Sequence, residues 1–129
     1  MQSNIKGELK QTARLFHDDR KFALQTLTGL LLVRQSEVIY FQHNDNLRHW
    51  QVYLTEDRVF KLRTNITAKH ILGISASFFQ MSQFIIVNVD YVESIDTQLH
   101  CVFHPPYNHL NIVISRRYYQ QLKENIEII

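Results

Sequence analysis

Three polar stretches interrupt a chain of short apolar runs, and each carries side chains that suit nucleic acid. The stretch "NDNLRHW" places Arg48 just before the apolar run that begins at Trp50. The stretch "QMSQF" places Ser82 and Gln83 between two apolar runs, with no charge and no Gly, Pro, Asn or Asp. The stretch "ISRRYY" carries two adjacent arginines. Arginine can bridge guanine O6 and N7, glutamine can bridge adenine N6 and N7, and hydroxyls suit phosphate, so the three stretches together favour a nucleic-acid partner.

A group of potential metal ligands also stands out, but its spacing argues against a metal site. The stretch "HCVFHPPYNH" holds His100, Cys101, His104 and His109. If 98–104 is a strand, His100 and His104 share one face about 13 Å apart, at about 3.3 Å per residue, while Cys101 points to the other face. One zinc or copper ion cannot reach both imidazoles at that distance. We expect surface histidines beside a buried cysteine, and neither a metal nor another cofactor.

The sequence lacks the motifs of the common enzyme classes. It contains no G-x-S-x-G elbow, P-loop, G-x-G-x-x-G or H-E-x-x-H, and only three glycines. The acidic pair Glu56-Asp57 stands beside Arg58 in a hairpin connection, where a solvated turn is the expected role. Catalysis is therefore the weaker hypothesis, and we expect a protein that is not an enzyme.

Length and composition predict one ordinary globular domain. The 129 residues are 45% apolar and 20% charged. The apolar fraction is enough for one hydrophobic core, and the charged fraction is too low to predict a disordered chain. No apolar run approaches the roughly 20 residues that cross a bilayer, and "MQSNIKGELK" lacks the apolar segment of a secretion signal. The single Cys101 excludes an intramolecular disulfide and fits a reducing compartment, so we expect a cytoplasmic location.

Charge is segregated along the chain although the total is only +2. Between 46 and 70, five basic residues against two acidic ones give +3, and 97–123 holds three basic residues and no acid. Between these segments, 78–96 holds three acidic residues and no base. This distribution predicts one basic face.

Hydrophobic patterning predicts a mainly β fold with two or three short helices. Residues 4–17 have the spacing of an amphipathic helix, and after Lys21 the chain breaks into short runs rich in Val, Ile, Leu and aromatics. "TEDR" is typical of a hairpin connection and "PPYN" of a turn. Such short strands pack as a sandwich or an open barrel.

Two further helices are predicted by their capping residues. "NITAKHILG" offers Asn65 or Thr67 as the N-cap and Gly73 as the C-cap. "SRRYYQQLKENIEII" begins at the candidate cap Ser115, and its buried face would carry Tyr119, Leu122 and Ile126.

The stretches "FFQMSQFIIVNVDYVESI" and "NIVISRRYYQQLKE" resemble the LytTR family of bacterial DNA-binding domains. Members read F-x-R-x-H-R/K-S-x-x-V-N and, before the last helix, V-S-R-x-Y. The matching positions are Phe78, Val87, Asn88, and Ser115 to Tyr118, with Ile114 in place of Val. Upstream, "EVIYFQ" resembles the D-I-x-Y-x-E strand and "KLRTNITAKHIL" the stretch that leads into a short helix. The resemblance covers about residues 24–125.

This sequence departs from the family pattern at one segment. The family's R-x-H-R/K-S is replaced by "QMSQF" (80–84), so two basic positions have become amides. The change removes charge from the segment expected to meet DNA and keeps hydrogen-bonding capacity. Residues 1–22 have no counterpart in the pattern, and we expect an N-terminal helix or linker there and the LytTR-like domain over 23–129.

The resemblance implies an elongated β–β–β arrangement with a C-terminal helix, whose inter-strand loops enter successive major grooves of double-stranded DNA. It implies an output domain of a bacterial transcription regulator of the response-regulator, two-component type. Such domains bind paired sites as homodimers, with an upstream receiver or membrane segment that this chain does not contain. Carried over by position, the base-contact candidates are Arg48, Gln83 and Arg116, and the phosphate-contact candidates are Arg63, Gln80, Ser82 and Arg117.

Plainer interpretations stand beside these. Gln83 can also be read as an exposed strand-entry residue and Arg63 as part of a solvated strand face, while Asn88 is expected to bond backbone at a strand kink. The alternative function is a β-rich protein-interaction module without nucleic-acid binding, whose surface contacts would be Tyr40, Trp50, Tyr53 and Tyr107. Single-stranded nucleic-acid binding by stacking on those aromatics is a third, weaker alternative.

Overall fold

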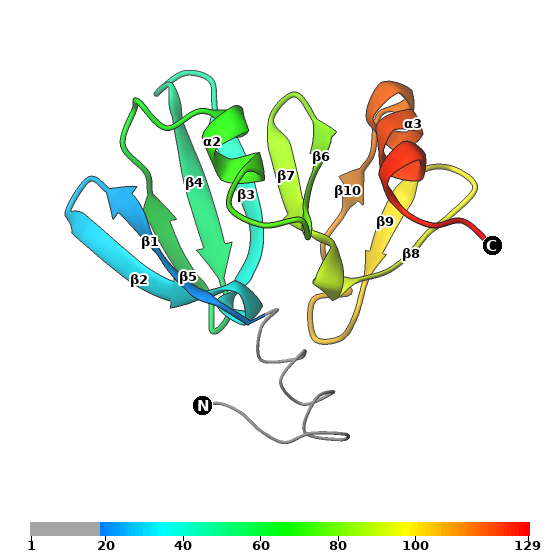
Figure 1. Ribbon diagram of the computed structural model, residues 1–129, viewed down its shortest axis with the longest axis horizontal. Helices are drawn as coiled ribbons and strands as arrows, with labels where there is room; N and C mark the ends of the chain where they lie inside the picture. Colours follow the sequence, from blue (N-terminus) through cyan, green and yellow to red (C-terminus); the bar gives the residue numbers. More distant parts are fainter. Residues whose placement is uncertain (1–18) are drawn as a thin grey trace.

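Three antiparallel β-sheets lie in a row along the long axis of the molecule (Figure 1). The computed structural model describes residues 19–129, so the helix predicted over 4–17 lies outside the described residues. The strands of the described part are β1 (Lys21–Thr26), β2 (Gly29–Arg34), β3 (Val38–Asn44), β4 (His49–Leu54), β5 (Arg58–Lys61), β6 (Phe78–Ser82), β7 (Ile85–Asn88), β8 (Val92–Ile95), β9 (His100–Phe103) and β10 (Ile112–Val113). The helical segments are η1 (Gln35–Glu37), α2 (Ala68–Leu72), η2 (Val89–Tyr91) and α3 (Arg116–Asn125). The predicted mainly β, elongated arrangement is confirmed.

The middle sheet has five strands in the order β5-β4-β3-β7-β6. The β1–β2 hairpin lies on one side of it, and the three-stranded sheet β10-β9-β8 lies on the other (Figure 1). The strands alternate their side chains between the two faces, as the period of two requires. Phe41, Val52 and Ile86 enter the core shared with the β1–β2 hairpin and α2. Val87 and Met81 enter the core shared with β9, β10 and α3.

Both helices are capped by residues that the sequence predicts as caps. Thr67 caps α2 by accepting a hydrogen bond at Oγ1 from the His70 N–H, and Gly73 is the C-cap. Ser115 caps α3 by accepting at Oγ from the Tyr118 N–H. The helix ends at Asn125, so Ile126, predicted on its buried face, lies just beyond it and is 40% exposed. Within residues 19–129, no helix is long and apolar enough to span a membrane.

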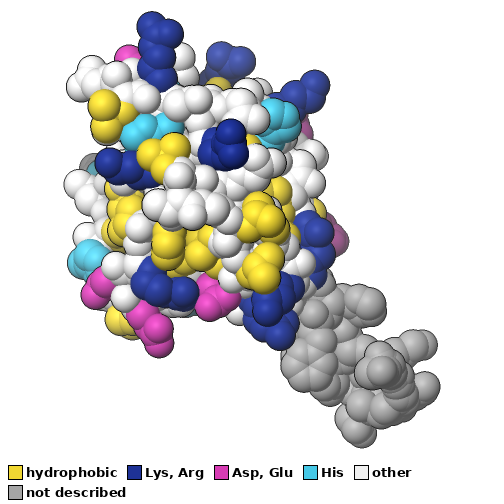
Figure 2. Space-filling model, turned by 90° about the vertical axis from the view of Figure 1, so that its left-hand side faces the viewer, with side chains coloured by type: hydrophobic (Ala, Val, Ile, Leu, Met, Phe, Trp, Pro, Cys, Tyr) yellow, Lys and Arg dark blue, Asp and Glu magenta, His cyan; other side chains and the backbone are white. Residues whose placement is uncertain are grey.

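The outer face of the β1–β2 hairpin is apolar and open to solvent. Leu27, Leu30 and Leu32 are 60%, 71% and 62% exposed. Figure 2 shows hydrophobic side chains on this side of the molecule, bordered by Lys and Arg. Leu30 and Leu32 alternate with Leu31 and Val33, which pack inward.

Of the aromatic residues assigned to a protein-binding surface, Trp50 is buried, and Tyr40 and Tyr53 are half-buried. Trp50 is 4% exposed and belongs to the core beside the β1–β2 hairpin, so its assignment as a surface contact is wrong. Tyr40 and Tyr53 stack on each other across β3 and β4, with ring centroids 4.3 Å apart. Burial raises the pKa of Tyr40 to about 12. The alternation of β3 and β4 explains both results, because it turns Trp50 and Tyr53 to opposite faces of the sheet.

Candidate nucleic-acid interface

The three polar stretches meet along one end of the five-stranded sheet. The β3–β4 loop, the β6–β7 turn and the N-terminus of α3 all lie at the upper end in Figure 1. Two backbone hydrogen bonds link them through the adjoining strands: the Ser115 N–H donates to Met81 O of β6 at 2.8 Å, and the His43 N–H of β3 donates to Phe84 O at 2.8 Å. We call residues 45–48, 82–84 and 115–117 the loop edge. Its segments are far apart in the sequence and contiguous in space.

The β3–β4 loop holds Arg48 in a defined backbone conformation. Asn44 Oδ1 accepts a hydrogen bond from the Leu47 N–H at 3.0 Å, which closes the loop locally. Arg48 follows with φ at 55°, in the left-handed region, and its side chain is exposed. An arginine costs more free energy than a glycine in this left-handed conformation. The stability of the fold therefore does not explain why this residue is an arginine.

The next residue, His49, is buried and incompletely bonded. Its Nδ1 lies 3.4 Å from Leu47 O, and its Nε2 has no hydrogen-bond partner among the described residues. The His49 side chain therefore packs at the start of β4, and the backbone of the loop determines where Arg48 lies.

The β6–β7 turn explains the uncharged polar break in the sequence. The register of β6 shifts between Gln80 and Ser82, so β6 carries a bulge at Met81, whose side chain is fully buried. Ser82 Oγ then accepts from the Phe84 N–H at 3.2 Å. This hydroxyl builds the turn that Gly, Pro, Asn or Asp would otherwise build. Gln83 stands exposed at the tip.

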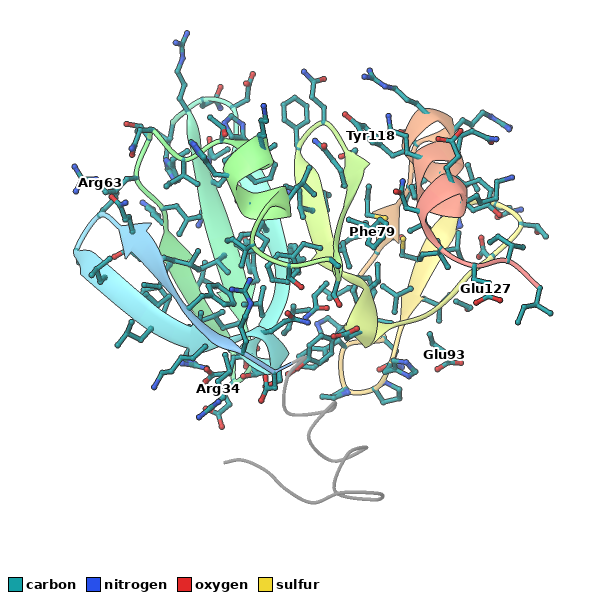
Figure 3. The ribbon with its side chains drawn as sticks, in the orientation of Figure 1. Arg34, Arg63, Phe79, Glu93, Tyr118 and Glu127 are labelled. Carbon is teal, nitrogen blue, oxygen red and sulfur yellow. The ribbon has the colours of Figure 1, made fainter. Side chains whose placement is uncertain are left out.

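The N-terminus of α3 presents two arginines to solvent. Arg116 and Arg117 occupy the first turn and are exposed, and the Arg117 guanidinium lies 5.4 Å from the centroid of the Tyr118 ring. Figure 3 shows Tyr118 on the side of α3 that faces β6. Cations at a helix N-terminus oppose the helix dipole by a few tenths of a kcal/mol, which a bound anion offsets. Among residues 19–129, Arg48, Arg116 and Arg117 form no ion pair.

Aromatic packing fixes the loop edge from beneath, and the sequence did not indicate it. The His43 ring stacks on Phe84, with centroids 6.1 Å apart, and meets Trp50 edge-on at 5.2 Å. His43 and Trp50 are cross-strand partners in the β3–β4 hairpin. The short separation of these two strands in the sequence is the one feature from which the His43–Trp50 contact could have been predicted. The contact with Phe84 depends on the pairing of β3 with β7 and has no local signal.

Two of the phosphate-contact candidates lie off the loop edge. Arg63 is exposed beside the tip of the β1–β2 hairpin, where its N–H donates to Gln25 O at 3.0 Å (Figure 3). Gln80 lies within β6, opposite Ile86, and is half-buried. Arg48, Ser82, Gln83, Arg116 and Arg117 all belong to the loop edge. The structure therefore brings five of the seven candidates together.

The histidine-rich stretch holds two histidines near carboxylates and a buried thiol. His100 Nδ1 lies 3.5 Å from Asp96 Oδ1, and His104 Nδ1 lies 3.6 Å from Glu93 Oε1. Cys101 is 3% exposed, which confirms the expected buried cysteine between surface histidines, and burial raises its pKa to about 11. In the described part of the chain, no three His, Cys, Asp or Glu side chains gather as metal ligands would.

Comparison with known proteins agrees with this architecture. Residues 28–127 match the family described as the LytTr DNA-binding domain. A solved structure, the "LytTr DNA-binding domain of putative methyl-accepting/DNA response regulator from Bacillus cereus", shares the fold with a TM-score of 0.61 at 20% sequence identity, over 84% of this chain and 97% of that one. No curated protein matches the sequence. Because the family match spans nearly the whole described chain, this protein belongs to the LytTR family of DNA-binding domains.

Proposed function

We propose that the chain binds specific double-stranded DNA sequences through the loop edge, without catalytic activity. The observation that supports this most is the contiguity of the edge, because the Met81–Ser115 and His43–Phe84 hydrogen bonds hold three exposed arginine side chains on one rigid end of the sheet. Rigid positioning of guanidinium and amide groups is what base readout requires. Arg48, Gln83 and Arg116 contact base edges in this proposal.

Phosphate contacts supply the rest of the affinity. Ser82 and Arg117 contact the backbone beside the bases read by the loop edge, and the Ser82 hydroxyl keeps its proton for a phosphate while Oγ accepts from Phe84. Arg63 and Gln80 lie off the edge, so they reach only phosphates that flank the bases being read. We expect them to contribute less than Arg117.

The wider role follows from the family. We propose an output domain of a cytoplasmic bacterial transcription regulator that binds paired sites as a homodimer. The input is a receiver or a membrane segment upstream of the domain. The Bacillus cereus domain that shares the fold is named as part of a response regulator, which supports this assignment by similarity of fold.

The experiment is a selection of bound fragments from random duplex DNA, followed by titrations of variants on the selected site at several salt concentrations. Arg116→Ala is expected to relax the base preference and to cost about 1–3 kcal/mol of binding free energy. Arg117→Ala is expected to weaken all sequences equally and to reduce the salt slope by about one. Arg20→Ala is the control, because it removes the same charge from an exposed residue at the other end of the sheet.

Two results would contradict the proposal. One is the recovery of no preferred duplex in the selection. The other is that Arg116→Ala and Arg117→Ala bind DNA as tightly as Arg20→Ala at every salt concentration. Arg116 and Arg117 would then lie outside the DNA interface, as Arg20 does.

A second candidate function, protein binding, is favoured by the exposed leucines of the β1–β2 hairpin. The face formed by Leu27, Leu30 and Leu32 is apolar, and large exposed apolar patches mark interaction sites. Its nearest test is self-association: sedimentation of the wild type and of Leu30→Ser should differ if two copies pair through this face. If the wild-type protein stays monomeric and selects no DNA, the exposed leucines would instead favour binding to a different protein.

A further inference from the structure

An apolar pocket of about 400 Å³ lies against the C-terminal half of α3, away from the loop edge. Its walls come from β6, β8, the α3 helix and the residues after it; the main lining residues are Met81, Val92, Ile95, Leu122, Ile126 and Ile128. Small-molecule sites have volumes of roughly 300–1,000 Å³ and mostly apolar walls with a few polar groups. This pocket has the size and the lining of such a site.

The chain after α3 closes one side of the pocket by alternation. Ile126 has extended backbone, with φ at −127° and ψ at 139°. Neighbouring side chains of an extended segment point in opposite directions, so Ile126 and Ile128 both line the pocket and Glu127 does not. Figure 3 shows Glu127 on this final segment. The described acidic residues that neighbour lining residues in the sequence do not line the pocket; they are Asp90, Glu93, Asp96, Glu124 and Glu127.

The polar groups of the lining are few and are positive or neutral. Among the lining residues that the structure describes, Lys123 carries the one charge, and Ser94 contributes a hydroxyl. The Lys123 Nζ lies 4.8 Å from the centroid of the Tyr119 ring, which also lines the pocket. Lys123 forms no ion pair within residues 19–129, and the carboxylate of Glu93, next to Ser94, lies 3.6 Å from His104 Nδ1. An ammonium without a carboxylate partner in this part of the chain therefore stands at an apolar pocket.

We propose that this pocket binds a medium-chain, straight-chain carboxylic acid. The alkyl chain occupies the apolar interior, and the carboxylate pairs with the Lys123 ammonium, with the Ser94 hydroxyl as a second donor. The charge of the lining selects the acid over a neutral or cationic amphiphile. The site is distinct from the loop edge, since Arg116 and Arg117 occupy the opposite end of α3.

The test is calorimetric titration of the full chain with hexanoate, octanoate and decanoate in the absence of DNA, so that its outcome is independent of the proposed DNA binding. Affinity is expected to rise by about fourfold for each methylene that becomes fully buried. Octanoate is expected to bind about three- to fivefold more tightly than octanamide, the neutral molecule of the same length, because a partly exposed ion pair contributes that much.

Two substitutions assign the contacts. Lys123→Met keeps the apolar stem and removes the charge, so the ratio of octanoate to octanamide affinity is expected to fall to about one. Lys21→Met, an exposed lysine on β1, is the matched control and is expected to keep the wild-type ratio. Ser94→Phe fills the pocket from β8 and is expected to weaken decanoate at least tenfold, with circular dichroism to verify folding.

Four results would overturn the proposal: no saturable binding of decanoate, equal affinity for octanoate and octanamide, a preference that survives Lys123→Met, or amide chemical-shift changes on decanoate binding that avoid α3 and β8. A concentration-dependent dimer that Ser94→Phe disrupts would also overturn it, because the occupant would then be a second copy of the chain.

Discussion

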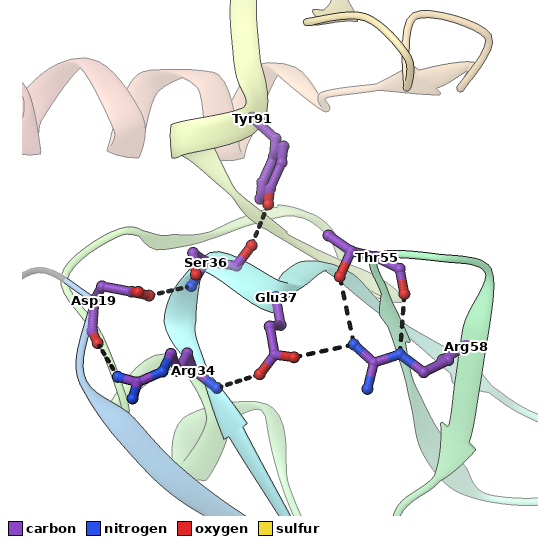
Figure 4. Close-up of polar contacts among 7 residues, drawn as sticks. All are labelled: Asp19, Arg34, Ser36, Glu37, Thr55, Arg58 and Tyr91. Carbon is purple, nitrogen blue, oxygen red and sulfur yellow. Dashed lines mark hydrogen bonds and ion pairs between the residues drawn. The ribbon is translucent and has the colours of Figure 1, made fainter.

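The two ends of the five-stranded sheet use arginine in opposite ways. At the loop edge, Arg48, Arg116 and Arg117 are exposed and have no carboxylate partner among the described residues. At the other end, arginines are held by carboxylates and carbonyls of the same chain (Figure 4). We call this second group the Glu37 cluster; its members are Asp19, Arg34, Ser36, Glu37, Thr55, Arg58 and Tyr91.

Hydrogen bonds and one ion pair connect the members of the Glu37 cluster. Glu37 Oε1 accepts from the Arg34 N–H at 2.8 Å, and Glu37 Oε2 pairs with Arg58 Nη2 at 3.1 Å. Asp19 Oδ1 accepts from the Ser36 N–H at 2.8 Å, and the Tyr91 hydroxyl donates to Ser36 O. These contacts join the start of the described chain, η1 and η2.

The contrast shows that residue type does not decide whether an arginine is paired within the fold or left free for a partner. The carboxylates of the Glu37 cluster bond to Arg58 and to backbone N–H groups of the same chain, whereas the guanidinium groups of the loop edge have no carboxylate partner among the described residues. Arg48 has a left-handed backbone, and Arg116 and Arg117 oppose a helix dipole. Sites that work against local stability are where function is expected.

The largest predicted effect concerns the buried layer beneath the Glu37 cluster. Asn88 is fully buried, and its Nδ2 donates to Gln35 O at 3.1 Å and to Val38 O at 2.9 Å. Asn88→Ala leaves two buried carbonyls without this donor and should cost about 2–3 kcal/mol of unfolding free energy. DNA affinity of the folded protein should stay at the wild-type value. Urea unfolding followed by the fluorescence of the buried Trp50 measures the loss.

Asn125→Ala is the control for Asn88→Ala. Asn125 is exposed and donates only to Gln121 O, so its replacement should cost less than about 0.5 kcal/mol. Equal losses for the two variants, or a DNA affinity that falls with Asn88→Ala, would contradict the division between a structural end of the sheet and the loop edge proposed to bind DNA.

Features set by near neighbours in the chain were predictable from the sequence. Thr67, Gly73 and Ser115 act as the caps that they were expected to be, because a cap bonds to the backbone within three residues. Asn88 was expected to bond backbone, and it does. Its main acceptors, however, lie some 50 residues away, which no local pattern indicates.

Features set by contacts between distant segments were not predictable. The bulge at Met81 and the stacking of Phe84 on His43 depend on the pairing of β6 and β3 with β7. Arg63 and Gln80 were placed by the family pattern with the other candidates, and packing sets them apart from the loop edge. A sequence pattern gives the order of strands, but register and three-dimensional neighbours come from the packed core.

The second prediction sharpens the comparison at Arg48. Arg48→Gly relieves a left-handed backbone position and should raise the unfolding free energy by about 0.5–1 kcal/mol. The same change removes a proposed base contact, so DNA affinity should fall by about 1–3 kcal/mol. Thermal unfolding and DNA titration on one preparation measure both.

Arg48→Ala separates the two consequences of that change. Alanine removes the guanidinium and keeps the backbone penalty, so affinity should fall as in Arg48→Gly while stability stays near the wild-type value. A glycine variant that is more stable and binds DNA with wild-type affinity would show that Arg48 does not contact DNA.

The smallest predicted effect is a pH dependence at the Glu37 cluster. The Arg34 N–H and the Arg58 guanidinium hold the pKa of Glu37 below its ordinary value, and the side chain and N–H of Ser36 do the same for Asp19. A carboxyl whose pKa is lower in the folded state stabilises the fold above its unfolded pKa, and this stability is lost as the pH falls through the folded value. Wild-type stability should therefore drop as the pH is lowered from 6 to below about 4.

Glu37→Gln stays neutral throughout, so its stability should show a shallower drop over the same pH range. At pH 6 the change should cost about 0.5–1 kcal/mol of unfolding free energy, a small loss because the ion pair is partly exposed. Denaturant unfolding at the two pH values measures both slopes, and parallel slopes for the two proteins would mean that Glu37 carries no folding energy through its charge. The interface arginines offer no such acid transition, since no carboxylate of the described chain is paired with them.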